Sequence, residues 1–259
     1  MILAHRLDGP AGAPVLVLSN SLGTTVGLWE AQLPELLPRF RVLRYDHPGH
    51  GDSPVAPDLT VEDLAERVLE LLDSLELERV SFCGLSLGGM VGMALALRSP
   101  ERLDRLALCS TAAYLGPPEG WYERARIVRA RGLEPIADSV LSRWFTERFR
   151  ADHPDVTGRF REMLTATPPH GYASCCEAIA SWDARQRIRE IALPTLVLVG
   201  AEDPATTLDH AAVIAGEIAD ARIVDIPAAA HLTNVEQPEV FTRVLLDQLT
   251  AEHGTEEAA

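Results

Sequence analysis

The sequence predicts an α/β fold in which a mostly parallel sheet is flanked by helices, and two observations support this. Short apolar runs with the length and composition of strands recur at residues 15–18, 42–45, 80–83, 105–109, 196–199 and 223–226. Apolar residues at helical spacing separate most of these runs, at residues 28–37, 61–72, 90–97, 211–218 and 240–249. Strands that alternate with helices indicate a parallel sheet covered on both faces, and such strands are expected to be apolar throughout.

One long segment breaks this alternation. Residues 113–189 are helical in character and rich in arginine, and they contain Trp121, Trp144 and Trp182. We interpret the segment as a helical cap inserted between two strands of a single domain covering residues 1–259. The core of that domain is then residues 1–112 and 190–250. We expect residues 251–259 to be a disordered tail.

The composition excludes several kinds of protein. With 259 residues, of which 47% are hydrophobic, the chain can bury one large core. A formal net charge of −15 argues against nucleic acid or an anionic membrane surface as a partner, because phosphate groups are bound by clustered cations. No window approaches ~20 uninterrupted apolar residues, and the first residues lack a secretory signal pattern. We therefore expect a soluble, cytoplasmic protein that acts on a small molecule, with the oligomeric state left open.

Residue usage narrows the chemistry further. All 23 basic residues are arginine, so no lysine is present to form a Schiff base, a phosphate-binding P-loop or a serine–lysine dyad. The cysteines contain no Cys-x-x-Cys pair; they are Cys83, Cys109, Cys175 and Cys176. We expect them to be small buried hydrophobic residues, with neither a structural zinc site nor a disulfide framework.

A serine after the third predicted strand is the candidate nucleophile. Ser86 lies in Gly84-Leu85-Ser86-Leu87-Gly88, directly after the run 80–83 and before the helical stretch 90–97. A Gly-x-Ser-x-Gly pattern between a strand and a helix is typical of a sharp turn that exposes the serine hydroxyl, and its glycines leave room for a strained backbone. We therefore expect Ser86 to attack a carbonyl carbon.

A serine nucleophile needs a base and a carboxylate that orients the base. Asp203 and His231 each lie in a loop after a predicted strand, at the edge of the sheet where ligand-facing residues collect. Glu202 is the alternative to Asp203, which we prefer for its position in the loop. The order Ser86, Asp203, His231 is that of α/β-hydrolases and differs from the order in two other serine triads.

Hydrolysis of an ester also requires two N–H donors for the oxyanion of the tetrahedral intermediate. One is expected from Leu87, the residue after the nucleophile. The other is expected from the loop after the first predicted strand, where Leu22 is our choice.

These residues make the chain resemble the α/β-hydrolase family over essentially its whole length. Asn20-Ser21-Leu22 is similar to the His-Gly-x oxyanion motif, and residues 46–53 resemble the Asp-x-Arg-Gly-x-Gly-x-Ser loop. Pro48 replaces the arginine of that loop. The contacts that this arginine makes in the family are therefore in doubt here, but the predicted triad is not affected. More narrowly, the chain is similar to 3-oxoadipate enol-lactonases at residues 18–24, 143–146, 171–176 and 229–231.

The resemblance implies hydrolysis of 3-oxoadipate enol-lactone to 3-oxoadipate in the degradation of protocatechuate or catechol. It also implies that no metal or organic cofactor takes part. From the triad we expect an acyl-enzyme intermediate on Ser86. The same triad could serve a carboxylesterase or a cofactor-free haloperoxidase-like enzyme, and a ligand receptor could keep the fold without turnover.

The implied substrate is a small anionic lactone, so we expect a nearby cation to bind its carboxylate. The predicted cap offers Arg124, Arg126, Arg129, Arg131, Arg143, Arg148 and Arg150, most of which we expect to be solvated. Arg143 and its neighbour Trp144 are our candidates for substrate binding. For Trp144, packing in the core is an equally good interpretation.

Overall fold

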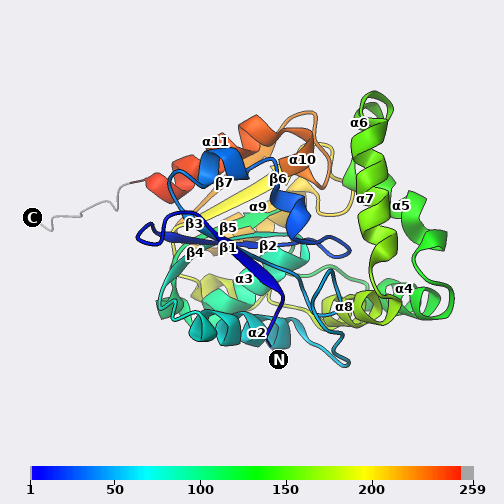
Figure 1. The fold of residues 1–259 in the computed structure, drawn as a ribbon, viewed down its shortest axis with the longest axis horizontal. Coiled ribbons are helices and arrows are strands. Elements are labelled where there is room, and N and C mark those ends of the chain that lie inside the picture. Colours follow the sequence, from blue (N-terminus) through cyan, green and yellow to red (C-terminus); the bar gives the residue numbers. More distant parts are fainter. Residues whose placement is uncertain (1, 252–259) are drawn as a thin grey trace, which may run out of the picture.

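A seven-stranded sheet forms the centre of the computed structural model, which describes residues 2–251 (Figure 1). The strand order is β1-β3-β2-β4-β5-β6-β7, and β1 is antiparallel to β3 while the other neighbouring pairs are parallel. The strands are β1 (His5–Asp8), β2 (Val15–Ser19), β3 (Arg41–Tyr45), β4 (Val80–Leu85), β5 (Leu103–Cys109), β6 (Thr195–Gly200) and β7 (Ala221–Ile226). The predicted α/β-hydrolase fold class, with its mostly parallel sheet, is confirmed.

Helices cover both faces of the sheet. In Figure 1, α2 and α3 lie on one face and α11 lies on the other. The flanking helices are α1 (Leu33–Leu36), α2 (Val61–Ser74), α3 (Leu87–Arg98), α9 (Leu208–Glu217), α10 (Thr233–Glu236) and α11 (Pro238–Thr250), with short 3₁₀ turns η1 (Val26–Trp29), η2 (Pro100–Arg102) and η3 (Ile188–Glu190). Helix α2 begins at a capping box between Thr60 and Asp63 and turns an apolar face to the core.

Two elements differ from the sequence-based expectation. Strand β1 was not predicted, because His5–Asp8 is a partly exposed edge strand with no apolar run. The helix expected at residues 28–37 is divided into η1 and α1, and α1 begins next to Pro34, which suits the first turn of a new helix.

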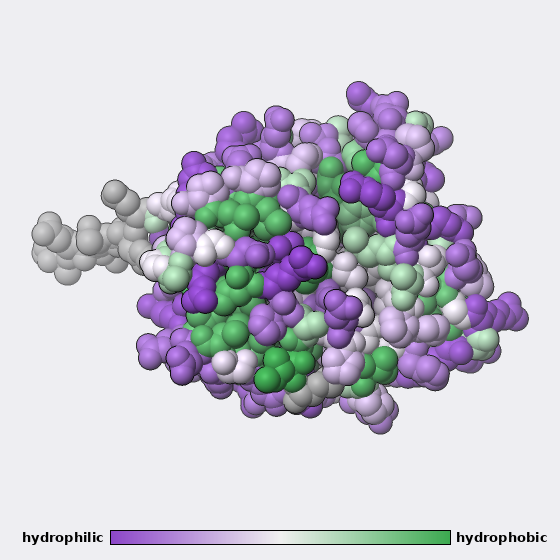
Figure 2. All heavy atoms as spheres, viewed as in Figure 1, coloured by the Kyte–Doolittle hydropathy of each residue, from purple (hydrophilic) through white to green (hydrophobic). Residues whose placement is uncertain are grey.

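Five helices between β5 and β6 form a layer beside the sheet, at the right-hand side of Figure 1. They are α4 (Pro118–Arg131), α5 (Glu134–Trp144), α6 (Glu147–Asp152), α7 (Pro154–Ala166) and α8 (Pro169–Ser181). We call residues 118–181 the cap. Hydrophilic side chains predominate around α6, and hydrophilic and apolar side chains are mixed along α7 (Figure 2).

The structure also bears on the expectations for the C-terminal tail, for membrane-spanning helices and for the cysteines. The tail expected at residues 251–259 lies outside the described part of the chain except for Ala251. Within residues 2–251, none of the helices has both the length and the apolar character needed to span a bilayer. All four cysteines are buried free thiols.

Candidate active site

The candidate nucleophile lies at a strained turn between β4 and α3. Ser86 has φ 57° and ψ −112°, and residues other than glycine rarely adopt a positive φ. A Cβ at Gly84 would lie 2.1 Å from the carbonyl oxygen of Gly88, and a Cβ at Gly88 would lie 2.3 Å from that of Ser19. Glycine is therefore required at both positions because backbone segments approach each other this closely.

The predicted acid and base lie together, in loops that follow neighbouring strands. Asp203 follows β6 and His231 follows β7, and Nδ1 of His231 lies 2.8 Å from Oδ2 of Asp203. Since a carboxylate only accepts hydrogen bonds, Nδ1 carries the proton and Nε2 of the neutral ring is left as an acceptor. Glu202, the alternative carboxylate, lines a separate cavity together with Glu236.

Additional hydrogen bonds hold the Asp203 carboxylate in place. Its Oδ1 accepts from the backbone N–H groups of Ala205 at 2.7 Å and Thr206 at 3.0 Å, and its Oδ2 accepts from the Thr206 hydroxyl at 2.7 Å. Burial alone would raise the pKa of Asp203, but the charge of His231 and the hydrogen bonds from His231 and Thr206 together lower that pKa below its usual value. The carboxylate therefore stays ionised and can orient the imidazole.

Ser86 and His231 line one cavity of about 490 Å³, to which Leu22 from the core and several side chains from the cap also contribute. This volume is suited to a small molecule. The described residues contain no hydrogen bond between Ser86 and His231; hydrogen bonds between a nucleophile and its base often tighten only with substrate.

The two loops expected to supply the oxyanion donors are joined by a hydrogen bond. The N–H of Gly88 donates to the backbone oxygen of Asn20 at 3.1 Å, which holds the loop after β2 against the start of α3. Leu87 is the first residue of α3, and the first N–H groups of a helix have no intrahelical acceptor. Leu22 borders the cavity from the other loop.

Two buried histidines of the 46–53 loop support this arrangement. Nε2 of His47 donates to the backbone oxygen of Asn20 at 2.9 Å, and the N–H of Gly23 donates to Nε2 of His50 at 3.0 Å. Burial lowers the pKa of His47 to about 3 and the pKa of His50 to about 4, so both rings are neutral near pH 7. The sequence identified this loop only by resemblance and did not reveal its contacts with the residues around Leu22.

Two arginines of the cap line the cavity, namely Arg143 on α5, which was preferred from the sequence, and Arg124 on α4. The guanidinium carbon of Arg124 lies 4.6 Å from the centre of the Trp121 ring. Within the described residues neither arginine forms an ion pair, whereas Arg126 and Arg129 pair with glutamates. Two guanidinium groups are therefore available to an anionic ligand.

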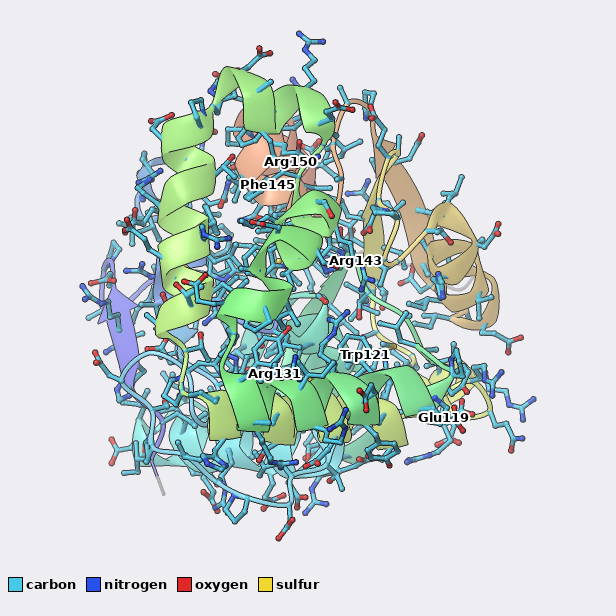
Figure 3. The ribbon with its side chains drawn as sticks, turned by 90° about the vertical axis from the view of Figure 1, so that its right-hand side faces the viewer. Glu119, Trp121, Arg131, Arg143, Phe145 and Arg150 are labelled. Carbon is cyan, nitrogen blue, oxygen red and sulfur yellow. The ribbon has the colours of Figure 1, made fainter. Side chains whose placement is uncertain are left out.

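Arg143 lines the cavity and is more exposed than Arg124. Partial burial and the charge of Arg124 lower the pKa of Arg143. Figure 3 shows Arg143 near the end of α5 and Trp121 near the start of α4 on the same side of the cap, while Arg131 lies at the other end of α4 and Arg150 lies on α6. Of the seven cap arginines considered from the sequence, Arg124 and Arg143 border the cavity that contains Ser86.

Trp144 combines both interpretations left open by the sequence. Its side chain is 4% exposed and packs edge-on against Phe160, with the ring centres 6.3 Å apart. It also borders the cavity. Trp144 is therefore both a packed residue of the cap and part of the cavity wall.

Sequence reasoning missed three residues of the site. Thr206 contacts Asp203, and Trp121 and Tyr172 line the cavity. The spacing of Asp203 and Thr206 could have indicated a turn in which the aspartate accepts N–H groups two and three residues further on. Tyr172 lies in the segment 171–176 that resembles enol-lactonases, whereas no signal distinguishes Trp121 from the other aromatic residues of the cap.

A serine on a strand-to-helix turn, with a His–Asp pair on adjacent loops and a helical cap above them, is the arrangement found in hydrolases of the α/β class. A family model described as alpha/beta hydrolase fold matches residues 14–238. The chain belongs to the α/β-hydrolase family and is a hydrolase.

Named relatives support this assignment. The chain is 38% identical to 3-oxoadipate enol-lactonase 2 of Acinetobacter baylyi over 94% of its own length and 91% of that protein. It is similar to the crystal structure of the enol-lactonase from Burkholderia xenovorans LB400, with 44% identity, 96% of each chain covered and a TM-score of 0.94. The structure of a hydrolase from Pseudomonas aeruginosa PA01 matches with 48% identity, covers 96% of this chain and 94% of that one, and has a TM-score of 0.93.

Proposed function

We propose that this protein hydrolyses 3-oxoadipate enol-lactone to 3-oxoadipate, as the names of its relatives suggest, in the degradation of protocatechuate or catechol. The observation that carries the proposal is one cavity that contains Ser86 and His231 together with two arginines that have no acidic partner among the described residues, Arg124 and Arg143. Such a cavity suits an ester whose free end is a carboxylate.

The proposed reaction begins at the lactone carbonyl. His231 accepts the proton of the Ser86 hydroxyl while Oγ attacks the carbonyl carbon, and Asp203 stabilises the imidazolium that forms. The N–H groups of Leu22 and Leu87 would bind the resulting oxyanion, and each donor of this kind contributes about 3 kcal/mol to lowering the barrier.

Collapse of the tetrahedral intermediate breaks the ring C–O bond and leaves an acyl group on Ser86. The enol oxygen takes the proton from His231, and the enol then becomes the ketone of 3-oxoadipate. Water, deprotonated by His231, attacks the acyl-enzyme and releases the second carboxylate. One imidazole thus serves acylation and deacylation, and in the last step it returns the proton taken from water to the Ser86 oxygen.

The cap is proposed to select the substrate. Arg124 and Arg143 would bind its carboxylate, and Trp144 would pack against the ring. A guanidinium group forms charge-assisted hydrogen bonds to a carboxylate that it cannot form to a neutral ester. The specificity for an anion is then separate from the hydrolytic step.

The test is a comparison of kcat/KM for 3-oxoadipate enol-lactone with kcat/KM for simple aryl and alkyl esters. We expect a large preference for the lactone. Equal or faster turnover of the neutral esters would favour a carboxylesterase. Ligand-induced stabilisation with no turnover of any ester would favour a receptor.

A further inference from the structure

A buried carboxylate outside the proposed triad lies close to the base. Glu236 ends α10, five residues after His231, and its side chain is 8% exposed. Glutamate is rarely buried unless its charge is compensated. Within residues 2–251, Glu236 forms no ion pair, and the donors that reach it are two backbone N–H groups and one hydroxyl.

The two oxygens of Glu236 bind two segments that are far apart in the sequence. Oε1 accepts from the backbone N–H of Thr146 at 2.9 Å and from its hydroxyl at 2.8 Å. Oε2 accepts from the backbone N–H of Ala230 at 2.5 Å. Thr146 caps helix α6 of the cap, and Ala230 directly precedes His231. One carboxylate therefore joins the cap to the loop that carries the base.

A second contact joins the same segments on the other side of His231. The N–H of Leu232 donates to the backbone oxygen of Trp144 at 2.9 Å. His231 thus lies between two residues that are both connected to residues 144–146, one directly and one through Glu236. The same cap segment follows Arg143, so the cavity wall and the base are held by shared contacts.

We propose that Glu236 is a positioning residue whose carboxylate sets the place of His231 relative to the cap segment 144–146. The proposal rests on the hydrolytic function given above. Only a carboxylate offers acceptors on both sides; an amide would turn an NH₂ group toward one of the N–H donors. Burial raises the pKa of Glu236, the hydrogen bonds from Ala230 and Thr146 oppose that rise, and nearby Glu202 adds to it.

The first test compares Glu236→Gln with Glu202→Gln by the rate of Ser86 labelling with a neutral fluorophosphonate. Glu202 borders the same cavity as Glu236, carries the same charge and is exposed, which makes it a matched control. We expect Glu236→Gln to slow labelling by roughly 10- to 100-fold, because small displacements of a catalytic group cost this much. Glu202→Gln should be labelled at the wild-type rate.

Two results would overturn the proposal. The first is wild-type labelling of folded Glu236→Gln, even with a lower Tm, since the role would then be only structural. The second is equal slowing in both glutamine variants, which would indicate a general effect of charge. If Glu236→Gln does not fold, Thr146→Val and Thr146→Ser test the proposal instead.

Thr146→Val removes one donor on the cap side, and Thr146→Ser retains it. We expect Thr146→Val to raise KM for the lactone severalfold more than it lowers kcat, because the cap wall moves while the Ala230 contact remains. Thr146→Ser should restore wild-type KM. Wild-type KM in Thr146→Val would count against the proposal.

The labelling measurement does not depend on the identity of the substrate. If the wild-type protein is labelled but leaves the enol-lactone intact, the proposed substrate is wrong, and the comparison of Glu236→Gln with Glu202→Gln still tests the role of Glu236.

Discussion

The sheet core and the cap contribute to the site in different ways. Every residue of β4 and β6 is buried, whereas α4 buries only Ala125 and Val128 among its 14 residues. The candidate catalytic residues Ser86, Asp203 and His231 follow strands of the core. The two arginines at the cavity, which have no acidic partner among the described residues, come from the cap.

We therefore assign the hydrolytic step to residues of the core and the selection of the substrate to residues of the cap. Positions at the ends of strands are set by backbone pairing in a rigid sheet, and they suit groups that must meet within hydrogen-bonding distance. Helices α4 to α7 of the cap expose faces that carry many arginines, whereas α8 is largely buried and has none. Their side chains reach the cavity only where the packing directs them there. We therefore expect changes in the core to affect kcat and changes in the cap to affect KM.

The largest effect is expected from the nucleophile itself. Ser86→Ala removes the attacking oxygen, and kcat should fall by roughly 10⁶-fold, as in other serine triads. Circular dichroism and thermal unfolding of the same variant provide the control for folding. Normal turnover by a folded Ser86→Ala variant would remove the basis for assigning chemistry to the core.

A smaller effect in the core is expected from Thr206→Val, with Thr206→Ser as the control that keeps the hydroxyl. Loss of a hydrogen bond to a charged group costs about 1.5 to 3 kcal/mol, so kcat should fall by roughly 10- to 100-fold. Because this bond lowers the pKa of Asp203, its loss should raise that pKa and shift the acid limb of the pH–rate profile to higher pH. An unchanged pH profile in a slower variant would contradict the assigned role.

The cap is tested by Arg143→Leu, measured with the anionic lactone and with a neutral ester. Loss of a charge-assisted hydrogen bond should raise KM for the lactone by roughly 10-fold or more and leave KM for the ester nearly unchanged. Arg126→Leu is the control, because Arg126 pairs with Glu123 on the outer surface of α4. Equal changes in KM for both substrates would argue against a contact between Arg143 and the carboxylate.

The contact between the two regions is tested by Gly171→Ala. A Cβ at Gly171 on α8 would lie 2.4 Å from the backbone oxygen of Gly49 in the core, so overpacking should destabilise the protein by about 1 to 3 kcal/mol. At roughly 2 to 4 °C per kcal/mol, the decrease in Tm is measurable by calorimetry. Gly158→Ala on α7 meets no atom within 4 Å and should keep or raise Tm. An unchanged Tm in Gly171→Ala would show that the cap can shift at low cost.

The alternation of apolar strands and helical stretches was sufficient to predict the fold class, since a buried parallel sheet requires it. It missed β1, which lies at an edge and has polar residues around the single apolar Leu7. Similarly, the loop that contains Pro48 was found by resemblance alone, and its contacts through His47 and His50 appear only in three dimensions.

The sequence by itself determined the class of fold and the three strand ends at which Ser86, Asp203 and His231 stand, because local patterns of apolar residues and glycines specify strands and sharp turns. Only the tertiary structure decided that Asp203 rather than Glu202 meets His231, that Arg124 joins Arg143 at the cavity, and that Glu236 links the base to the cap. These relations depend on the directions of side chains across elements far apart in the chain, and no local pattern encodes those directions.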